Sequence, residues 1–125
     1  MVLVFTDGVD NASFLGPSEL LPAARRMGIV VHAVELGDAL NPRSRAGSFL
    51  GVLADVTGGR QWNAASSRDL RRLFTSAIDE MRARYLVTFY PAGVKHNGWH
   101  ELKVAIRGRG EVKTRPGYFV GAPNE

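Results

Sequence analysis

Short apolar runs, separated by stretches with helical spacing, dominate the hydrophobic pattern of the first two thirds of the chain. Residues 2–5 read Val-Leu-Val-Phe, and residues 29–36 are mostly β-branched and apolar. Residues 60–63 form a brief third candidate strand. Continuous apolar runs are typical of strands covered on both faces, as inside a parallel sheet. The pattern therefore predicts three parallel strands, the first with neighbours on both sides.

Helical segments are predicted between these strands. Residues 18–27 are followed by Gly28, a common helix stop, and Pro22 is expected to delay the regular helix until near Leu21. Residues 48–57 place apolar side chains on one side and end in a Gly-Gly pair. Because each helix lies between two strands, the connections are expected to be right-handed parallel crossovers.

The clearest helical pattern covers residues 70–81, where apolar residues recur every three or four positions. Ser66 is placed to cap this helix, with Asp69 three residues later. Strand and helix then alternate three times, which is half of a doubly wound sheet. The predicted fold class is α/β, with a partial Rossmann-like parallel sheet flanked by helices.

The last third of the chain has a different pattern. Residues 85–90 are strand-like, residues 101–107 alternate polar with apolar, and residues 118–120 follow a Pro-Gly pair. Alternation indicates a strand with one face in water, so a three-stranded antiparallel β meander is expected. The chain thus divides into an α/β part, residues 1–84, and a meander extension packed on it, residues 85–125.

Composition limits the classes of function. The chain has 125 residues with 45% hydrophobic content, which is ordinary for one globular domain. It has no cysteine, which excludes disulfides, thiolate metal sites and cysteine nucleophiles. No apolar stretch is long enough for a membrane span. Residues 1–59 carry a net charge of −2 and residues 60–125 one of +6, but the basic residues are dispersed, which argues against nucleic-acid binding.

Nothing in the sequence forms a familiar catalytic motif. Ser13, His32 and Asp55 could be imagined as a triad, but no Gly-x-Ser-x-Gly elbow is present and no base is positioned. The pair Gly58-Gly59 ends a helix rather than opening one, so it is no phosphate-binding loop. His96 and His100 have no partner at ligand spacing. A non-enzymatic protein is expected.

Several motifs, taken in order, resemble the second half of a von Willebrand factor A (VWFA) domain, in particular the bacterial VWFA-related group. These motifs are Val-Leu-Val-Phe-Thr-Asp-Gly at residues 2–8 with Asp10-Asn11, Gly-Ile-Val-Val at 28–31, and Leu-Ala-Asp-Val-Thr-Gly-Gly-Arg at 53–60. Members of the group end in sequences similar to residues 84–91, 98–104 and 115–118. Together the motifs cover almost the whole chain.

The resemblance implies a metal-ion-dependent adhesion site at the carboxyl edge of the sheet, suited to Mg²⁺, Ca²⁺ or Mn²⁺. Asp7 matches the third-loop aspartate, which often reaches the metal through water, and Asp10 and Asn11 add nearby oxygens. The Asp-x-Ser-x-Ser loop and the second-loop Thr of the family are missing, so the chain alone is expected to hold no cofactor unless those ligands are supplied. The alternative is that Asp7 merely ends a strand at a tight turn.

Two functions remain open. The first is an adhesion-type protein-interaction module with an unknown protein partner. The second is self-assembly into a homodimer or larger oligomer through Val2, Leu3, Val4 and Phe5, because that strand lacks the neighbour it has in the family. The family implies an extracytoplasmic location if a signal lies upstream, and a cytoplasmic one otherwise. Whether Met1 is the natural start stays open.

Overall fold

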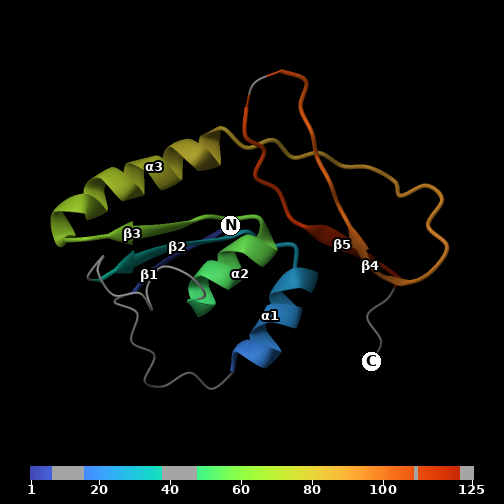
Figure 1. Cartoon of the computed structure of the whole chain (residues 1–125), viewed down its shortest axis with the longest axis horizontal. Coiled ribbons are helices and arrows are strands. Elements are labelled where there is room, and N and C mark those ends of the chain that lie inside the picture. Colours follow the sequence, from blue (N-terminus) through green and yellow to red (C-terminus); the bar gives the residue numbers. More distant parts are fainter. Residues whose placement is uncertain (7–15, 38–47, 109, 122–125) are drawn as a thin grey trace.

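A computed structural model describes residues 1–6, 16–37, 48–108 and 110–121 as a mixed α/β fold (Figure 1). Its elements form two separate sheets, one of three parallel strands and one of two antiparallel strands. In chain order the elements are β1 (Val2–Thr6), α1 (Pro17–Arg26), β2 (Val31–Leu36), α2 (Phe49–Thr57), β3 (Gln61–Ala64), the 3₁₀ turn η2 (Ser67–Asp69), α3 (Leu70–Arg82), β4 (Gly98–Glu101) and β5 (Gly117–Val120).

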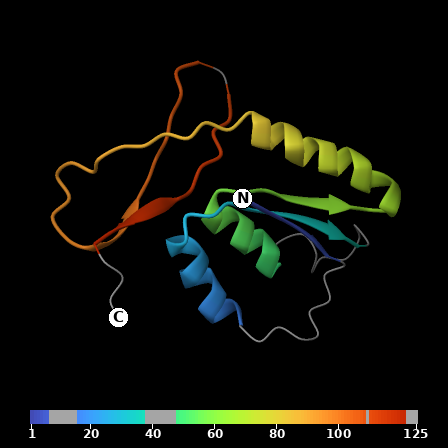
Figure 2. The ribbon, with the colours of Figure 1, turned by 180° about the vertical axis from the view of Figure 1, so that it is seen from behind.

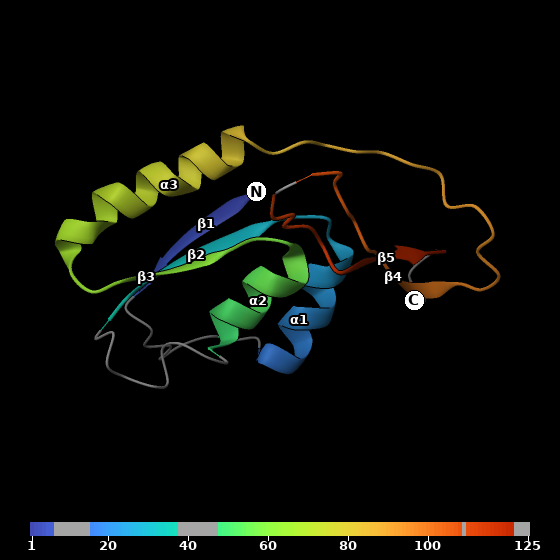
Figure 3. The ribbon, with the colours of Figure 1, turned by 45° about the horizontal axis from the view of Figure 1, so that its top comes forward.

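The parallel sheet has the order β1-β2-β3, so successive strands are neighbours. Val2 lies opposite Val31 in the first pair, and Ala33 lies opposite Gln61 in the second. Helices α1 and α2 cover one face of the sheet and α3 covers the other (Figures 2 and 3). The predicted parallel sheet with helices on both faces is therefore confirmed at this level.

The core consists of two apolar clusters, one on each face of the sheet. Ala24, Val31 and Leu53 join α1, β2 and α2 on one face. On the other face, Val34, Ala64 and Leu73 join β2, β3 and α3. Burial of these side chains is the main favourable contribution to folding. Because both clusters use β2, that strand is the centre of the fold.

The C-terminal end of α2 is held tightly against the start of β2. The Thr57 hydroxyl, which is fully buried, donates to the Leu53 carbonyl at 2.8 Å and accepts from the Val31 N–H at 3.0 Å. Gly58 then adopts a left-handed conformation with φ of 76°, the usual helix stop. Gly59 lies directly against the carbonyl oxygen of Val31. No side chain larger than hydrogen fits at residue 59.

The predicted helices form with small shifts at their ends. Ser48 caps α2 by accepting from the Gly51 N–H at 3.1 Å. Before η2, the Asp69 carboxylate accepts from the Ser66 N–H at 3.2 Å, as the spacing predicted. The expected late start of α1 is wrong, because the helix begins at Pro17 and contains Pro22. A proline at the first helical position has the right φ, which favours this earlier start.

The expected three-stranded meander is wrong. Residues 85–90 form no strand, and the alternating segment 101–107 contributes only its first residue to one. The antiparallel sheet instead pairs β4 with β5, with Trp99 opposite Phe119. Strand propensity is a property of side chains, whereas a ladder also needs a partner backbone. Residues 85–90 have none among the described residues, and the pairing of residues 101–107 with the β5 side goes no further than the Leu102 N–H, which donates to the Pro116 carbonyl at 2.9 Å.

The small antiparallel sheet packs beside the end of α1 through cation–π contacts. The Arg25 guanidinium lies 5.7 Å from the centre of the Trp99 ring, and that of Arg26 lies 5.4 Å from the Phe119 ring. Arg115 Nη2 also donates to the Arg25 carbonyl at 2.8 Å. These contacts fix β4 and β5 against α1, away from β1 (Figure 1).

Replacing Gly59 by alanine should destabilise the protein strongly. A Cβ at residue 59 would clash with the Val31 carbonyl, so β2 or α2 must move. We expect a loss of about 3 kcal/mol in the free energy of unfolding, at the upper end of overpacking costs. Gly37→Ala is the matched control, since a Cβ added there would meet no atom within 4 Å. Denaturant unfolding measures both variants, and equal stabilities would contradict the account of the α2–β2 junction.

Candidate functional site

The first strand of the chain lies at an edge of the parallel sheet, which corrects the expectation of neighbours on both sides. Among the described residues, β1 pairs only with β2. Its apolar side chains are consequently incompletely covered: Val2 is 42% exposed and Phe5 is 48% exposed. Leu3 and Val4 are partly buried against the core. A strand of core composition thus borders open space.

The backbone of β1 offers hydrogen-bonding groups on its open side. The Val2 N–H donates to the Val30 carbonyl at 2.8 Å, so residue 2 faces β2. Successive residues of a strand direct their N–H and C=O groups to opposite sides, so Leu3 and Phe5 direct theirs away from β2. An edge strand with such a row is a template for pairing with another strand.

Aromatic side chains flank this edge on the α3 side. The Phe5 ring stacks on Phe74 of α3 with centroids 6.3 Å apart, and Phe74 is itself 49% exposed. Met81 lies two helical turns beyond Phe74 and is also exposed. We call β1 with Phe5, Phe74 and Met81 the open edge. It combines unpaired backbone groups with uncovered apolar surface.

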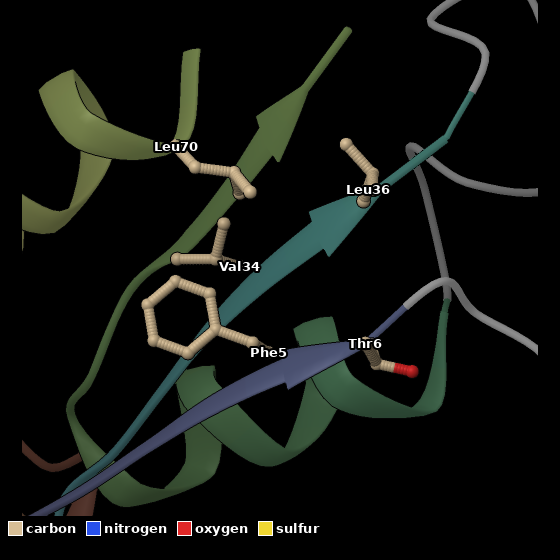
Figure 4. A pocket seen from close by; sticks show the side chains of 5 residues that line it. All are labelled: Phe5, Thr6, Val34, Leu36 and Leu70. Atoms are coloured by element: carbon tan, nitrogen blue, oxygen red, sulfur yellow. The ribbon is translucent and has the colours of Figure 1, made fainter. Parts of the chain in front are cut away.

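A pocket of about 420 Å³, lined mostly by apolar side chains, adjoins the open edge at the carboxyl ends of β1 and β2. Figure 4 shows Phe5, Val34 and Leu70 around it, with contributions from three elements of the fold. Leu36 and Thr6 complete the lining. The pocket is partly open to the outside.

The predicted metal ligands Asp7, Asp10 and Asn11 lie outside the described residues, so the structure does not show how their side chains are arranged. In the described ranges, no group of three or more His, Asp or Glu side chains is placed to hold a metal ion.

A buried carboxylate that the sequence reasoning missed lies near the carboxyl edge of the sheet. Glu35, near the end of β2, is only 8% exposed and accepts from Gln61 Nε2 at 2.7 Å. The same amide lies 3.0 Å from the hydroxyl of Ser48, the residue that caps α2. The network ties α2 to β2 and β3. The sequence did contain a signal for this buried carboxylate, because Glu35 is an acidic residue within a strand of core type.

The buried histidine of β2 lies at the other end of the sheet, on the α3 side. His32 is fully buried, stacks on Trp62 at 5.4 Å, and accepts from the Arg60 N–H through Nδ1 at 3.1 Å. Its Nε2 has no hydrogen-bond partner among the described residues. Burial lowers the pKa of His32 below its usual value of 6.5, and Arg84 lowers it further, while the nearby carboxylate of Glu80 opposes the shift.

The imagined triad is not brought together by the fold. His32 faces α3, whereas Asp55 belongs to α2 on the opposite side of the sheet. Lys113 Nζ lies 2.6 Å from the Asp55 carboxylate, so that residue has a structural partner. Ser13 lies outside the described residues.

Two histidines that lie four residues apart in the sequence come together in the structure, although they belong to no group of three metal-ligating side chains among the described residues. The rings of His96 and His100 stack with centroids 4.6 Å apart, and His100 also stacks on Tyr118 at 5.6 Å. Strand β4 begins between them and brings residue 100 back over residue 96. The four-residue spacing was a sequence signal that the two rings could meet. Whether they do depends on the conformation of the turn between them, which the sequence alone does not reveal.

Comparisons with protein-family models, with curated proteins and with solved structures gave no match. Within the described ranges, no helix has the length and apolar character needed to cross a membrane.

Acid should destabilise the fold through His32. Because the folded state lowers the pKa of His32 below 6.5, the unfolded state takes up this proton first as the pH falls. Stability is therefore expected to fall as the pH drops through 6.5 towards the folded-state pKa. His32→Asn keeps an acceptor for the Arg60 N–H but does not titrate.

Unfolding in denaturant at about pH 7.5 and pH 5.5 checks this, with Glu80, Arg60 and Arg84 unchanged in both proteins. The wild type should lose more stability between the two conditions than His32→Asn. Equal losses would assign the acid sensitivity to other groups.

Proposed function

We propose that the chain is a non-enzymatic protein-interaction module of the VWFA type, whose open edge binds an extended strand of a protein partner. One observation carries the proposal: β1 has the composition of a core strand, yet its outer side is unpaired in the described structure. Addition of a strand to a sheet edge is a common mode of peptide recognition. Backbone bonds supply affinity there, and pockets for alternate side chains supply specificity.

The edge suits a strand in both its polar and its apolar parts. Leu3 and Phe5 together offer two donors and two acceptors, and each hydrogen bond made is worth about 1 kcal/mol net. Phe5 and Phe74, each about half exposed, offer apolar surface beside them. A partner strand with alternate apolar residues would cover these rings and place one side chain in the adjoining pocket.

The order of elements supports the VWFA-type reading. In the second half of such a domain, the Thr-Asp-Gly strand is followed by two further parallel strands with helices between them, and β1, β2 and β3 follow this order. The first strand of such a domain would lie against β1. On this reading Asp7 is one ligand of a Mg²⁺, Ca²⁺ or Mn²⁺ site whose other ligands come from elsewhere.

A second candidate function is self-assembly, in which two copies pair through Val2, Leu3, Val4 and Phe5. The uncharged composition of β1 favours it, since no charge would be buried between the copies. Antiparallel pairing about a twofold axis would join two three-stranded sheets and close the interface. In this case the chain acts without a metal ion.

Peptide selection tests the binding of strands to the open edge. The chain is immobilised sparsely, so that copies do not meet, and is panned with a random peptide library. The selected peptides should be extended sequences with alternate apolar residues. Phe5→Pro removes the ring and the outward N–H, whereas the matched Phe5→Ala removes the ring alone. We expect binding to weaken with Phe5→Ala and to be lost with Phe5→Pro.

Peptides that bind wild type and both variants equally would show that the open edge is not the binding site. Thermal unfolding of the three proteins is the control, because a misfolded variant would also lose binding.

Divalent metal should leave the isolated chain unaffected. A ligand present at 100 times its Kd stabilises the folded state by about 2.7 kcal/mol, which raises Tm by several degrees. With only Asp7 matched to the family's ligands, we expect no rise in Tm with millimolar Mg²⁺ or Mn²⁺ compared with NaCl of equal ionic strength. A rise that Asp7→Ala abolishes would contradict the incomplete site.

A further inference from the structure

A second unpaired segment of strand-like composition follows α3. Tyr85, Leu86 and Tyr90 are 93%, 94% and 99% exposed, and Val87 is 77% exposed. The backbone of residues 85–90 makes no hydrogen bond with the rest of the described chain. Figures 1 and 3 show this segment running away from the parallel sheet towards β4. We call residues 85–90 the free segment.

The free segment has the chemistry of a buried strand. It reads Tyr-Leu-Val-Thr-Phe-Tyr, in which every residue is aromatic, β-branched or leucine, and it contains neither charge nor proline. Such a sequence has high strand propensity and is prone to pair when exposed. With six residues, it is one residue longer than β1, which has five, so it is long enough to pair with the whole of that strand.

We propose that the free segment of one copy adds as a strand to the open edge of a second copy, and that the second copy reciprocates. The inference rests on the proposed strand-binding function of the open edge and names its occupant. The exchange pairs two backbone segments in each copy that have no protein partner among the described residues. Both partners are uncharged, so no ion loses its hydration.

Exchange between copies fits the path of the chain better than pairing within one copy. In its own chain the free segment leads towards β4, and its Phe89 ring meets that of Tyr118 in β5 at 5.3 Å. Strand β4 is held beside α1 by the contact of Trp99 with Arg25. The open edge lies elsewhere, along β1. Both features occur in every copy, so two reciprocal additions close about a twofold axis and leave no free end for further growth.

The available area is sufficient for a stable dimer. Three aromatic rings of the free segment, Tyr85, Phe89 and Tyr90, are 93%, 50% and 99% exposed. At about 200 Å² for a ring side chain they offer on the order of 500 Å² in each copy. Leu86, Val87 and the surface of the open edge add to this, against about 1,600 Å² in total for a standard interface.

Direct pairing of two β1 strands would satisfy the open edges but leave both free segments exposed. Exchange covers all four surfaces at once. The structure therefore favours the free segment over a second β1 as the strand that occupies the open edge.

Proline variants test the exchange, because proline removes one backbone donor. Thr88→Pro acts at the centre of the free segment, where Thr88 is exposed, and Phe5→Pro acts on the open edge. Ala105→Pro is the matched control, since Ala105 is also exposed and outside any strand. Light scattering after size exclusion at about 100 µM, well above a micromolar Kd, measures the mass against 13.6 kDa for one chain.

Wild type and Ala105→Pro should have twice the chain mass, and Thr88→Pro and Phe5→Pro should each have the mass of one chain. An equimolar mixture of the two monomeric variants should again contain dimers, because one intact free segment meets one intact open edge. Thermal unfolding of each variant confirms that it is folded before the mass is interpreted.

A dimer of Thr88→Pro alone would overturn the exchange and indicate β1–β1 pairing. A dimer of Phe5→Pro alone would also overturn it and indicate pairing of two free segments. A monomeric wild type, or a mixture that stays monomeric, would likewise refute it. None of these results removes the strand-binding function of the open edge, which is decided separately by whether selected peptides depend on Phe5.

Discussion

Pairing of backbone groups along the strands is the constraint on which the rest of this structure depends. A buried N–H or C=O without a partner costs free energy, so a sheet is stable only where each strand has neighbours or water. Strand β2 has neighbours on both sides, and its first five residues are buried. Strand β1 has one neighbour among the described residues and stays partly exposed, although its composition is at least as apolar as that of β2. The two strands therefore differ in burial because β2 lies in the middle of the described sheet and β1 lies at its edge.

Local signals allowed the helices to be predicted well. The cap of α2 by Ser48, its stop at Gly58 and the Ser66–Asp69 contact before α3 each involve residues within a few positions of one another. Such contacts depend little on the remainder of the fold, so sequence is sufficient for them. The parallel order of β1, β2 and β3 followed from the alternation of strand and helix.

The features that failed to be predicted depend on contacts that the local sequence pattern does not specify. Residues 85–90 have strand-forming side chains, but no segment of the described chain lies beside them to form a ladder. The stacking of His96 on His100 and the burial of Glu35 beside Gln61 also depend on how distant elements or turns are placed. The candidate site was anticipated only in part: β1 was identified, whereas Phe74 and the pocket near Leu70 required the position of α3.

Binding of a strand at the open edge, as proposed, would be coupled to folding. The Leu3 side chain packs against the core and the Phe5 ring stacks on Phe74, while the backbone groups of both residues face outward. A strand added there would therefore do more than bury its own apolar surface, because it would also hold β1 against β2 and reduce fraying of the sheet. Since a ligand that binds only the folded state stabilises it, occupancy of the edge would raise the stability of the whole domain. A strand partner, whether another protein or a second copy, would thus act as a missing part of the sheet.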